Sequence, residues 1–545
     1  MPGPTRLLRA ARRRAVAPVL IAAAACAGAA ASADGVPEPA ARPQLVVLIA
    51  VDQLRGDYVP RWSAQLTSGL GRFWREGAFF AEGRQNHAVT ETAPGHSTML
   101  SGRFPAHTNI VTNEHGVLDP ASPLLELKDA GLGASPRRFR GTTLFDWMRA
   151  ADPAARVLAV SRKDRGAILP VGRFKGDVFW YAGGIFTTSA WYRTDTLPGW
   201  VREWNTGDPV RKVAGWTWNP LLKDPSAYPE PDSIAAENGG RDIAFPHQLT
   251  ANGDAAAVLL PNYPVMDSLT LAFALRGVER MRLGQGRATD LLVVSLSSTD
   301  AVGHGYGPDS RELHDQVLQL DRWLGRFLDS LWTVVPRERT LLALTADHGT
   351  ASMPEYISTI RHRAAGRIWF GDLAAELDTH FGRALAGREP FGFRDGILYG
   401  DVAALRGAGV NVDSVARSLA ARMTSTPGVR RVFTPASLKS APAADADAVL
   451  CRRSLPQDFG WLACGFVQPD YIWSPAITLA MHGSAHPDDQ RVPVAFLGPG
   501  ITARQYPDTV STTDIAPTLA ALLGVRPTER LDGRVLQQVM RRGAR

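Results

Sequence analysis

Four short apolar runs stand out along the chain, and none of them alternates as a strand with one solvated face would. They cover residues 45–51, 291–296, 341–345 and 492–497. Continuous runs of this length are typical of strands buried on both faces, as in parallel sheets. The longer stretch 309–331 spaces its apolar residues as an amphipathic helix does. We therefore predict an α/β fold with a mostly parallel central sheet and helices on both faces.

Polar residues follow three of these runs closely. Asp52 comes directly after the first run, Asp300 after the second and Asp347 after the third. Ligands of open parallel sheets bind beyond the carboxyl ends of the strands. A single aspartate in such a place is usually a turn former or a helix cap. Three of them at strand ends that converge predict one shared site.

Histidines accompany these aspartates at spacings suited to metal ions. His304 follows Asp300 by four residues, His348 is next to Asp347, and His482 lies in a fourth segment. Three aspartates and three histidines are enough for two ions with three protein ligands each, which leaves positions open for substrate. Imidazole favours zinc over magnesium or calcium. Two metals about 4 Å apart can hold the attacking and leaving oxygens of an in-line displacement.

A candidate nucleophile lies in the segment Thr92-Ala93-Pro94-Gly95-His96. We predict Thr92 at a helix N-cap, with Pro94 in the first turn. A helix N-terminus attracts phosphate, and a metal can activate a hydroxyl. Thr90 is a weaker candidate for the same role. We expect His96 to have a structural or supporting role.

Together, these segments resemble the alkaline phosphatase superfamily. Within it they are most similar to the type I phosphodiesterase and nucleotide pyrophosphatase group, in its phosphate-irrepressible, monomeric alkaline phosphatase branch with a Thr nucleophile. The resemblance runs from about Leu45 to the C-terminus, where the segment 513–519 is also typical. It implies the three-layer, alkaline-phosphatase-like sandwich with lid insertions.

The resemblance also implies a role for each matching residue. The first of two Zn²⁺ would be held by Asp300, His304 and His482. The second would be held by Asp52, Asp347 and His348, and would bind the oxygen of Thr92. Hydrolysis would then pass through a phosphothreonine.

Three further residues match the monoesterase branch: Asn113 as a phosphate-binding amide, and Lys163 with Arg165 as a pair that grips non-bridging oxygens. A monoester dianion carries more oxygen charge than a diester, so added cations favour monoesters. A phosphodiesterase or nucleotide pyrophosphatase with the same metals is the alternative. A sulfatase would need Cys or Ser in place of Thr92. A non-catalytic binding protein would have lost ligands that are all present here.

The remaining sequence indicates how the chain is organised. We predict one catalytic domain, residues 34–545, with insertions at about 174–264 and 354–471 that act as lids. Separate domains are the alternative. Cys451 and Cys464 predict a local disulfide in an exported protein, with two buried thiols as the alternative.

The first 33 residues are typical of a bacterial secretory signal peptide. Five arginines precede an Ala-rich apolar run, and Ala31-Ser32-Ala33 forms a small-residue cleavage site. These arginines supply most of the net charge of +7. We expect a periplasmic or extracellular monomer without a stable membrane anchor, with lipidation at Cys26 a minor option. Its substrates would be small phosphate esters, and no basic run with aromatics suggests nucleic acid.

Overall fold

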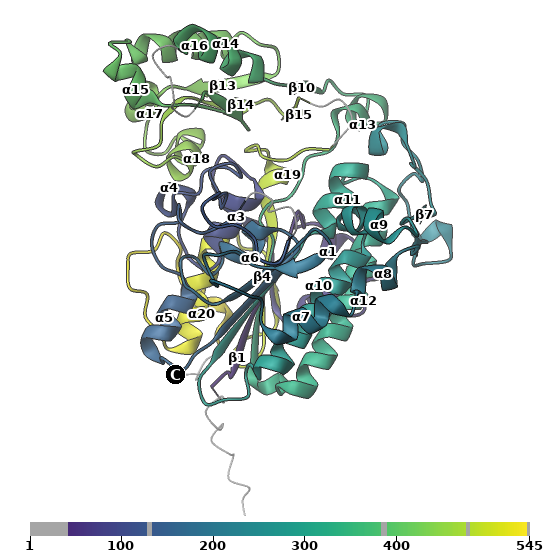
Figure 1. Cartoon of the computed structure of the whole chain (residues 1–545). Coiled ribbons are helices and arrows are strands. Elements are labelled where there is room, and N and C mark those ends of the chain that lie inside the picture. Colours follow the sequence, from purple (N-terminus) through teal and green to yellow (C-terminus); the bar gives the residue numbers. More distant parts are fainter. Residues whose placement is uncertain (1–41, 128–132, 383–389, 476–479, 542–545) are drawn as a thin grey trace, which may run out of the picture. The chain divides into compact units, whose positions relative to one another are not determined.

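The computed structural model describes residues 42–127, 133–382, 390–475 and 480–541. The predicted signal peptide and Cys26 lie outside these residues. A ten-stranded sheet forms the centre, in the order β17-β2-β16-β9-β1-β8-β3-β4-β5, with β18 beside β2 (Figure 1). Its parallel core consists of β9 (Thr340–Thr345), β1 (Leu45–Val51), β8 (Asp290–Leu296), β3 (Val157–Ser161) and β4 (Asp177–Ala182).

The fourth predicted strand is β16 (Arg491–Leu497), and it runs antiparallel to its neighbours. It pairs with β9 on one side and with β2 (Ala78–Arg84) on the other. The start of β16 therefore lies at the same edge as the carboxyl end of β9. The outer strands are β17 (Arg504–Tyr506), β18 (Val510–Ser511) and β5 (Ile185–Thr187).

The side chains of β1 enter two separate hydrophobic cores, which explains its unbroken apolar run. Leu45, Val47 and Ile49 belong to one core, whereas Val46 and Leu48 belong to the other. The first core is covered by helices that include α2 (Gly69–Glu76), α10 (Val265–Met281) and α12 (Arg311–Val334). The second is covered by helices that include α3 (Thr92–Met99), α5 (Leu144–Ala151) and α20 (Ile515–Leu523). The predicted α/β fold with helices on both faces is confirmed.

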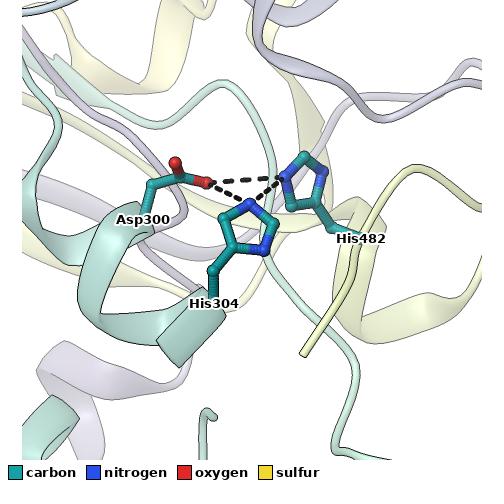
Figure 2. Close-up of side chains that lie close together, drawn as sticks. All are labelled: Asp300, His304 and His482. Atoms are coloured by element: carbon teal, nitrogen blue, oxygen red, sulfur yellow. Dashed lines mark hydrogen bonds and ion pairs between the residues drawn. The ribbon is translucent and has the colours of Figure 1, made fainter. Parts of the chain in front are cut away.

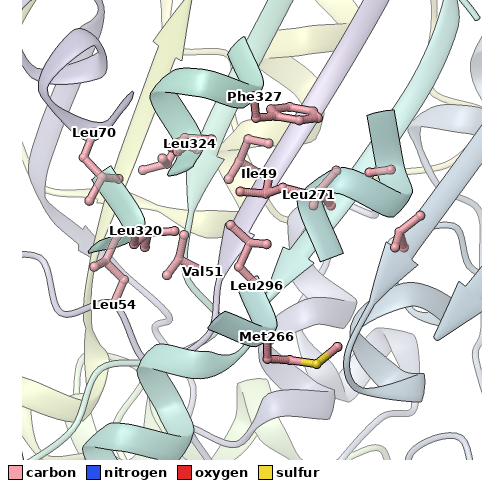
Figure 3. Close-up of a cluster of buried hydrophobic side chains, with 14 of the residues drawn as sticks. Ile49, Val51, Leu54, Leu70, Met266, Leu271, Leu296, Leu320, Leu324 and Phe327 are labelled. Carbon is pink, nitrogen blue, oxygen red and sulfur yellow. The ribbon is translucent and has the colours of Figure 1, made fainter. Parts of the chain in front are cut away.

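The first core shows how the predicted amphipathic helix packs. Leu320, Leu324 and Phe327 of α12 face Ile49 and Val51 of β1 (Figure 3). Each such side chain contributes about 1.5–3 kcal/mol when it is fully buried. Helix α12 begins after Ser310, whose hydroxyl accepts a hydrogen bond from the Leu313 N–H at 3.1 Å. This packing fixes the carboxyl edge of the sheet, where the polar residues gather.

The two predicted insertions differ in their relation to the sheet. Residues 174–264 contribute β4 and β5 to the sheet itself, so a boundary at 174 was too early. The Trp- and Pro-rich sequence of this region lacks the periodicity that would have indicated these strands. Residues 354–471 include a separate antiparallel sheet, ordered β11-β12-β14-β13, with a hydrophobic core of its own. These strands are β11 (Gly392–Arg394), β12 (Ile397–Tyr399), β14 (Trp461–Val467) and β13 (Val429–Phe433).

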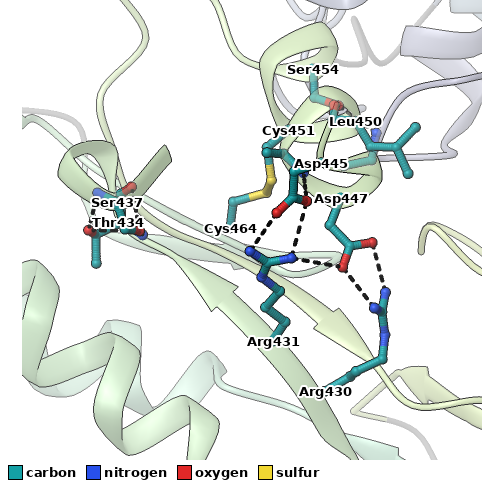
Figure 4. Close-up of a disulfide and its surroundings, with 12 residues drawn as sticks. Arg430, Arg431, Thr434, Ser437, Asp445, Asp447, Leu450, Cys451, Ser454 and Cys464 are labelled. Carbon is teal, nitrogen blue, oxygen red and sulfur yellow. Dashed lines mark hydrogen bonds and ion pairs between the residues drawn. A yellow bond between two sulfur atoms is a disulfide. The ribbon is translucent and has the colours of Figure 1, made fainter. Parts of the chain in front are cut away.

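A disulfide joins Cys451 of α18 (Ala446–Ser454) to Cys464 of β14, and this prediction is confirmed (Figure 4). Next to it, Arg430 and Arg431 of β13 form ion pairs with Asp447 and Asp445, each at 2.7 Å. The covalent link and the ion pairs attach the same helix to the sheet of the second insertion.

Within the described ranges, no single helix is both long and apolar enough to cross a membrane. Two helical segments joined by a bend, Gly253–Asn262 and Val265–Met281, together are long and apolar enough for a membrane span by length and composition alone.

Candidate active site

Helix α3 places Thr92 at the carboxyl edge of the sheet. The N-cap is Glu91, with extended backbone, and Thr92 is the first helical residue, so the predicted N-cap was one residue too late. The Thr92 side chain is buried. The start of α3 packs closely against the loop after β9. A Cβ added at Gly95 would lie 2.1 Å from the Asp347 carbonyl oxygen, so only glycine fits there. This close approach brings the hydroxyl of Thr92 next to the predicted metal ligands.

Lys163 connects the nucleophile to the aspartates. It is the N-cap of α6 (Asp164–Ile168), directly after β3. Its Nζ lies 2.6 Å from Asp52 Oδ2, 2.7 Å from Asp300 Oδ2 and 3.3 Å from Thr92 Oγ1. One ammonium group therefore contacts the candidate nucleophile and two predicted metal ligands.

The three histidines share one hydrogen-bonding arrangement. Nδ1 of His304 lies 2.6 Å from the Ala480 carbonyl oxygen, Nδ1 of His482 lies 2.8 Å from that of Thr90, and Nδ1 of His348 lies 3.0 Å from that of Gly349. A carbonyl oxygen only accepts, so each Nδ1 carries the proton. Each Nε2 is left with a lone pair for a metal ion, as in metal-binding histidines held by backbone carbonyls.

Two groups of side chains could each hold one ion. In the first, Asp300 Oδ1 lies 3.2 Å from His304 Nε2 and 3.4 Å from His482 Nε2 (Figure 2). The second consists of Asp52, His348 and again Asp300. Asp300 therefore belongs to both groups, which places the two ion positions side by side.

Asp347, expected in the second group, lies at its margin. Its Oδ1 accepts hydrogen bonds from the N–H groups of Gln53 and His348, and its Oδ2 lies 3.6 Å from His348 Nε2. One carboxylate oxygen of Asp347 is thus directed toward the second group, whereas the other is hydrogen-bonded to backbone N–H groups.

Buried polar atoms without partners test whether metal ions fit these groups. Asp52 Oδ1 and His348 Nε2 are buried, form no hydrogen bond with any described residue, and lie 3.4 Å apart. A buried carboxylate oxygen and a buried imidazole lone pair are costly without a partner, and a cation between them satisfies both. The imidazole and carboxylate donors suit zinc.

The charges at the site shift several pKa values. Burial, together with Asp300 and Asp347, raises the pKa of Asp52. Burial also raises the pKa of Asp300, but Lys163 and His304 outweigh it and hold that pKa well below its usual range. Burial and the neighbouring His482 lower the pKa of His348, which keeps this imidazole neutral as a metal ligand requires.

Asn113 and Arg165 lie less directly at the site. Asn113 Oδ1 accepts a hydrogen bond from the Ala93 N–H at 2.9 Å, so its amide sits beside the first turn of α3. Arg165 Nη1 lies 3.5 Å from Asp164, and its Nε is buried without a partner. In the described part of the chain, Arg165 forms no ion pair with the other predicted site residues.

Thr90 and His96 have other partners. The hydroxyl of Thr90 donates to the Ser484 carbonyl oxygen at 2.6 Å. His96 Nδ1 lies 2.9 Å from the Thr92 carbonyl oxygen and 3.1 Å from Asp347 Oδ2, and its Nε2 lies 2.9 Å from Ser295 Oγ. His96 therefore braces the first turn of α3 against two strand ends, which supports the expected structural role.

Two residues of the site were not among those predicted from the sequence. Gln53 has a positive φ and donates from Nε2 to Asp300 Oδ1 at 3.0 Å. Glu91 accepts a hydrogen bond from the Asn113 N–H at 2.6 Å and is hydrogen-bonded to Asp395 of the second insertion. The first could have been suspected from its place after Asp52. The role of Glu91 depends on a contact with a residue about 300 positions away, which no local sequence pattern can indicate.

Comparisons with known proteins identify the family of the chain. The family model of type I phosphodiesterase / nucleotide pyrophosphatase matches residues 46–368. The chain is 30% identical to alkaline phosphatase PhoV of Synechococcus elongatus, with 93% of this chain and 94% of the relative covered. It is 32% identical to alkaline phosphatase PhoK of Sphingomonas sp, with 91% of each covered.

A solved structure shows the same similarity. The crystal structure of alkaline phosphatase PafA superposes with a TM-score of 0.84 at 26% identity, and covers 92% of this chain and 99% of that chain. The resemblance inferred from the sequence motifs is confirmed. The chain belongs to the type I phosphodiesterase and nucleotide pyrophosphatase family, in the branch that contains these alkaline phosphatases.

Proposed function

We propose that this protein is a zinc-dependent alkaline phosphatase that hydrolyses phosphate monoesters through a phosphothreonine at Thr92. One observation carries the proposal. Lys163 Nζ lies 3.3 Å from Thr92 Oγ1 and contacts Asp52, which belongs to the second metal group, and Asp300, which belongs to both. Nucleophile, cation and metal ligands thus meet at a single point. The relatives named alkaline phosphatase support the same reaction.

The reaction takes two displacements. Thr92 Oγ1 attacks phosphorus, the bond to the ester oxygen breaks, and the alcohol leaves. Water then attacks the phosphothreonine, which releases phosphate and restores the hydroxyl. Two zinc ions in these groups would stabilise charge on oxygen and lower the pKa of bound water. Asp300, His304 and His482 would hold one, and Asp52, Asp347 and His348 the other, beside Thr92.

The remaining polar groups act on the phosphoryl oxygens. Lys163 lies next to the hydroxyl of Thr92 and supplies positive charge where charge develops. Asn113 lies beside the Ala93 N–H at the N-terminus of α3, where an anion is favoured. Arg165, whose Nε has no partner, would complete the contacts once substrate is present.

The alternative from the same family is a phosphodiesterase or nucleotide pyrophosphatase. The buried ammonium of Lys163 beside Thr92 favours the monoester dianion, which carries the larger charge. Rates with an aryl phosphate and with the matching diaryl phosphate distinguish the two. A higher kcat/KM for the diester would overturn the monoesterase assignment.

The sequence supports further proposals about the setting. The signal-like residues 1–33 indicate export to the periplasm or the medium, where the enzyme would act as a monomer and release phosphate from small esters. N-terminal sequencing of the exported protein tests this, because retention of residues 1–33 would contradict processing.

The decisive experiment replaces the nucleophile. Thr92→Ala should lower kcat/KM for an aryl phosphate at least about 10³-fold, because among the described residues no other hydroxyl is hydrogen-bonded to the ammonium group of Lys163. Thr90→Val serves as the matched control and should cost less than tenfold, since the Thr90 hydroxyl bonds only to a backbone carbonyl. Zinc content should remain two per chain in both variants. Near-normal turnover by the Thr92 variant would exclude this nucleophile.

A further inference from the structure

A pocket of about 580 Å³ opens beside the first metal group. Asp300 and His304 form part of its wall, together with Arg162, Trp218, Asn262 and Tyr306. Neither Thr92 nor Lys163 is among the described residues that line it. In an in-line displacement the leaving group departs opposite the nucleophile. The pocket is therefore placed to receive the leaving group of the ester.

Arg162 is the unusual residue of this wall. It lies directly before Lys163, just after the end of β3. Its Nη1 donates to the Pro261 carbonyl oxygen at 3.2 Å, whereas its Nε is buried and has no hydrogen-bond partner in the described part of the chain. Within the described ranges no carboxylate lies within 4.0 Å of its guanidinium. A guanidinium has five N–H donors, and a sequestered one without an anion is costly.

The other charges of the pocket already have partners. Asp242 Oδ1 lies 3.1 Å from His247 Nδ1, and Asp300 Oδ2 lies 2.7 Å from Lys163 Nζ. The side chain of Arg162 is thus the charged group of the wall that lacks a counterion among the described residues. Burial lowers the pKa of Arg162, which is the direction expected for a cation without a close counterion.

We propose that this pocket binds the leaving group and that Arg162 recognises a second anionic group on it. The preferred substrates would be phosphate monoesters whose alcohol carries a further phosphate or a carboxylate. Guanidinium groups bind both oxyanions through paired N–H donors. This inference rests on the proposed phosphatase function and adds a substrate class to it.

A second explanation must be separated from this one. Asp300 and Asp52 also act on Arg162 electrostatically, so the guanidinium could merely balance the carboxylates of the metal groups. In that case its removal would affect every substrate to the same extent. Recognition of an anionic leaving group would instead affect only substrates that carry the extra charge.

The experiment compares three substrates with the same three-carbon chain: propyl phosphate, 1,3-propanediol bisphosphate and the phosphate ester of 3-hydroxypropanoate. Phosphate release by the zinc-loaded full chain gives kcat/KM for each. We expect both anionic esters to exceed propyl phosphate at least tenfold. A preference for the bisphosphate alone would identify phosphate as the recognised group and would also support the proposal. Equal values for all three would overturn it.

Variants then assign the preference to Arg162. Arg162→Ala should reduce at least tenfold the ratio of kcat/KM for the esters with a charged leaving group to kcat/KM for propyl phosphate. Arg162→Lys should retain part of this preference. Leu259→Ala trims an exposed part of the same wall without changing charge, and should change all three rates alike. An unchanged ratio in Arg162→Ala, or equal losses on all three substrates, would overturn the proposal. If the wild-type protein hydrolysed neither these three substrates nor an aryl phosphate, that result would instead contradict the proposed function.

Discussion

At the scale of single residues, three cations in the segment 162–165 meet three different environments. Lys163 is nearly enclosed between Asp52 and Asp300, whereas Arg165 has only a distant contact with Asp164. Arg162 forms part of the pocket wall. The sequence shows three similar charges in a polar loop. Their environments differ because β3 ends here and α6 begins, so neighbouring side chains leave the backbone in different directions.

Removal of Lys163 and Arg165 should change substrate preference. The double substitution Lys163→Ala with Arg165→Ala should lower kcat/KM for an aryl phosphate at least tenfold more than for the matching diester. The monoester has the larger charge to neutralise. Steady-state kinetics on both substrates measures the effect. Parallel losses on both esters would show that these residues do not set the preference.

Glu237 predicts a pH dependence of stability. It is buried, its Oε1 has no hydrogen-bond partner among the residues that the structure describes, and burial with the neighbouring Glu312 raises its pKa to about 8. The folded state thus keeps a proton that the unfolded state loses near pH 4.5, so the free energy of unfolding falls as pH rises from about 4.5 to 8. Glu237→Gln should remove this loss, roughly 4 kcal/mol between pH 5 and 9.

Urea unfolding of wild type and variant at pH 5, 7 and 9 measures that difference. Glu338→Gln, at an exposed position, provides the control and should leave the pH profile as it is in the wild type. Identical profiles for Glu237→Gln and wild type would contradict the assignment of the buried proton.

At the scale of elements, strand direction decides how His482 reaches the site. The apolar run of β16 looks like those of the parallel strands, but β16 runs the other way. His482 precedes this strand in the chain, and the start of β16 lies at the carboxyl edge of β9. A residue before an antiparallel strand therefore joins residues that follow parallel ones. Hydrophobic patterns show that a strand is buried but do not show its direction.

The hairpin of β11 and β12 connects the second insertion to the nucleophile. At its tip, Arg394 forms an ion pair with Glu114 and lies 3.8 Å from Glu91 Oε1. Asp395 is hydrogen-bonded to Glu91, and a Cβ at Gly483 would lie 2.3 Å from its carboxyl carbon. Since Gly483 has a φ of +117°, only glycine allows this approach without strain. The insertion thus holds the residues on either side of the site.

Loss of this contact should reduce catalysis from a distance. Arg394→Ala leaves Glu91 without its nearby cation, and we expect kcat/KM to fall about tenfold through misplacement of α3. Arg394→Lys should recover part of it. Arg422→Ala, which breaks an exposed pair with Glu376 in the same insertion, is the matched control and should have wild-type rates. Wild-type rates for Arg394→Ala would show that the hairpin does not position the nucleophile.

At the scale of the whole molecule, the metal groups are assembled from four distant segments. Asp52, Asp300, Asp347 and His482 belong to regions that only the folded sheet brings to one edge. All three aspartates are buried, and Lys163 forms ion pairs with two of them, Asp52 and Asp300. The folded chain therefore concentrates negative charge that bound cations would offset, which couples metal binding to folding.

Metal removal should accordingly affect activity and stability together. We expect two zinc ions per chain by elemental analysis, loss of phosphatase activity with a chelator, and recovery on zinc addition. Ions that bind only the folded state at about 10³ times their Kd add about 4 kcal/mol to the free energy of unfolding. His482→Ala should bind one zinc fewer. A metal-free chain with full activity would exclude this role.

The sequence alone determined the buried strands, the fold class, the family and the chemical types at the site. These follow from local information, because apolar runs report burial and Asp–His spacings report possible ligands. Only the tertiary structure decided that β4 belongs to the sheet, that Asp300 is common to both metal groups, and that Arg162 has no counterion among the described residues. It also brought Asp395 to Glu91. Such features depend on strand direction and on contacts between distant segments, which arise only when the chain folds.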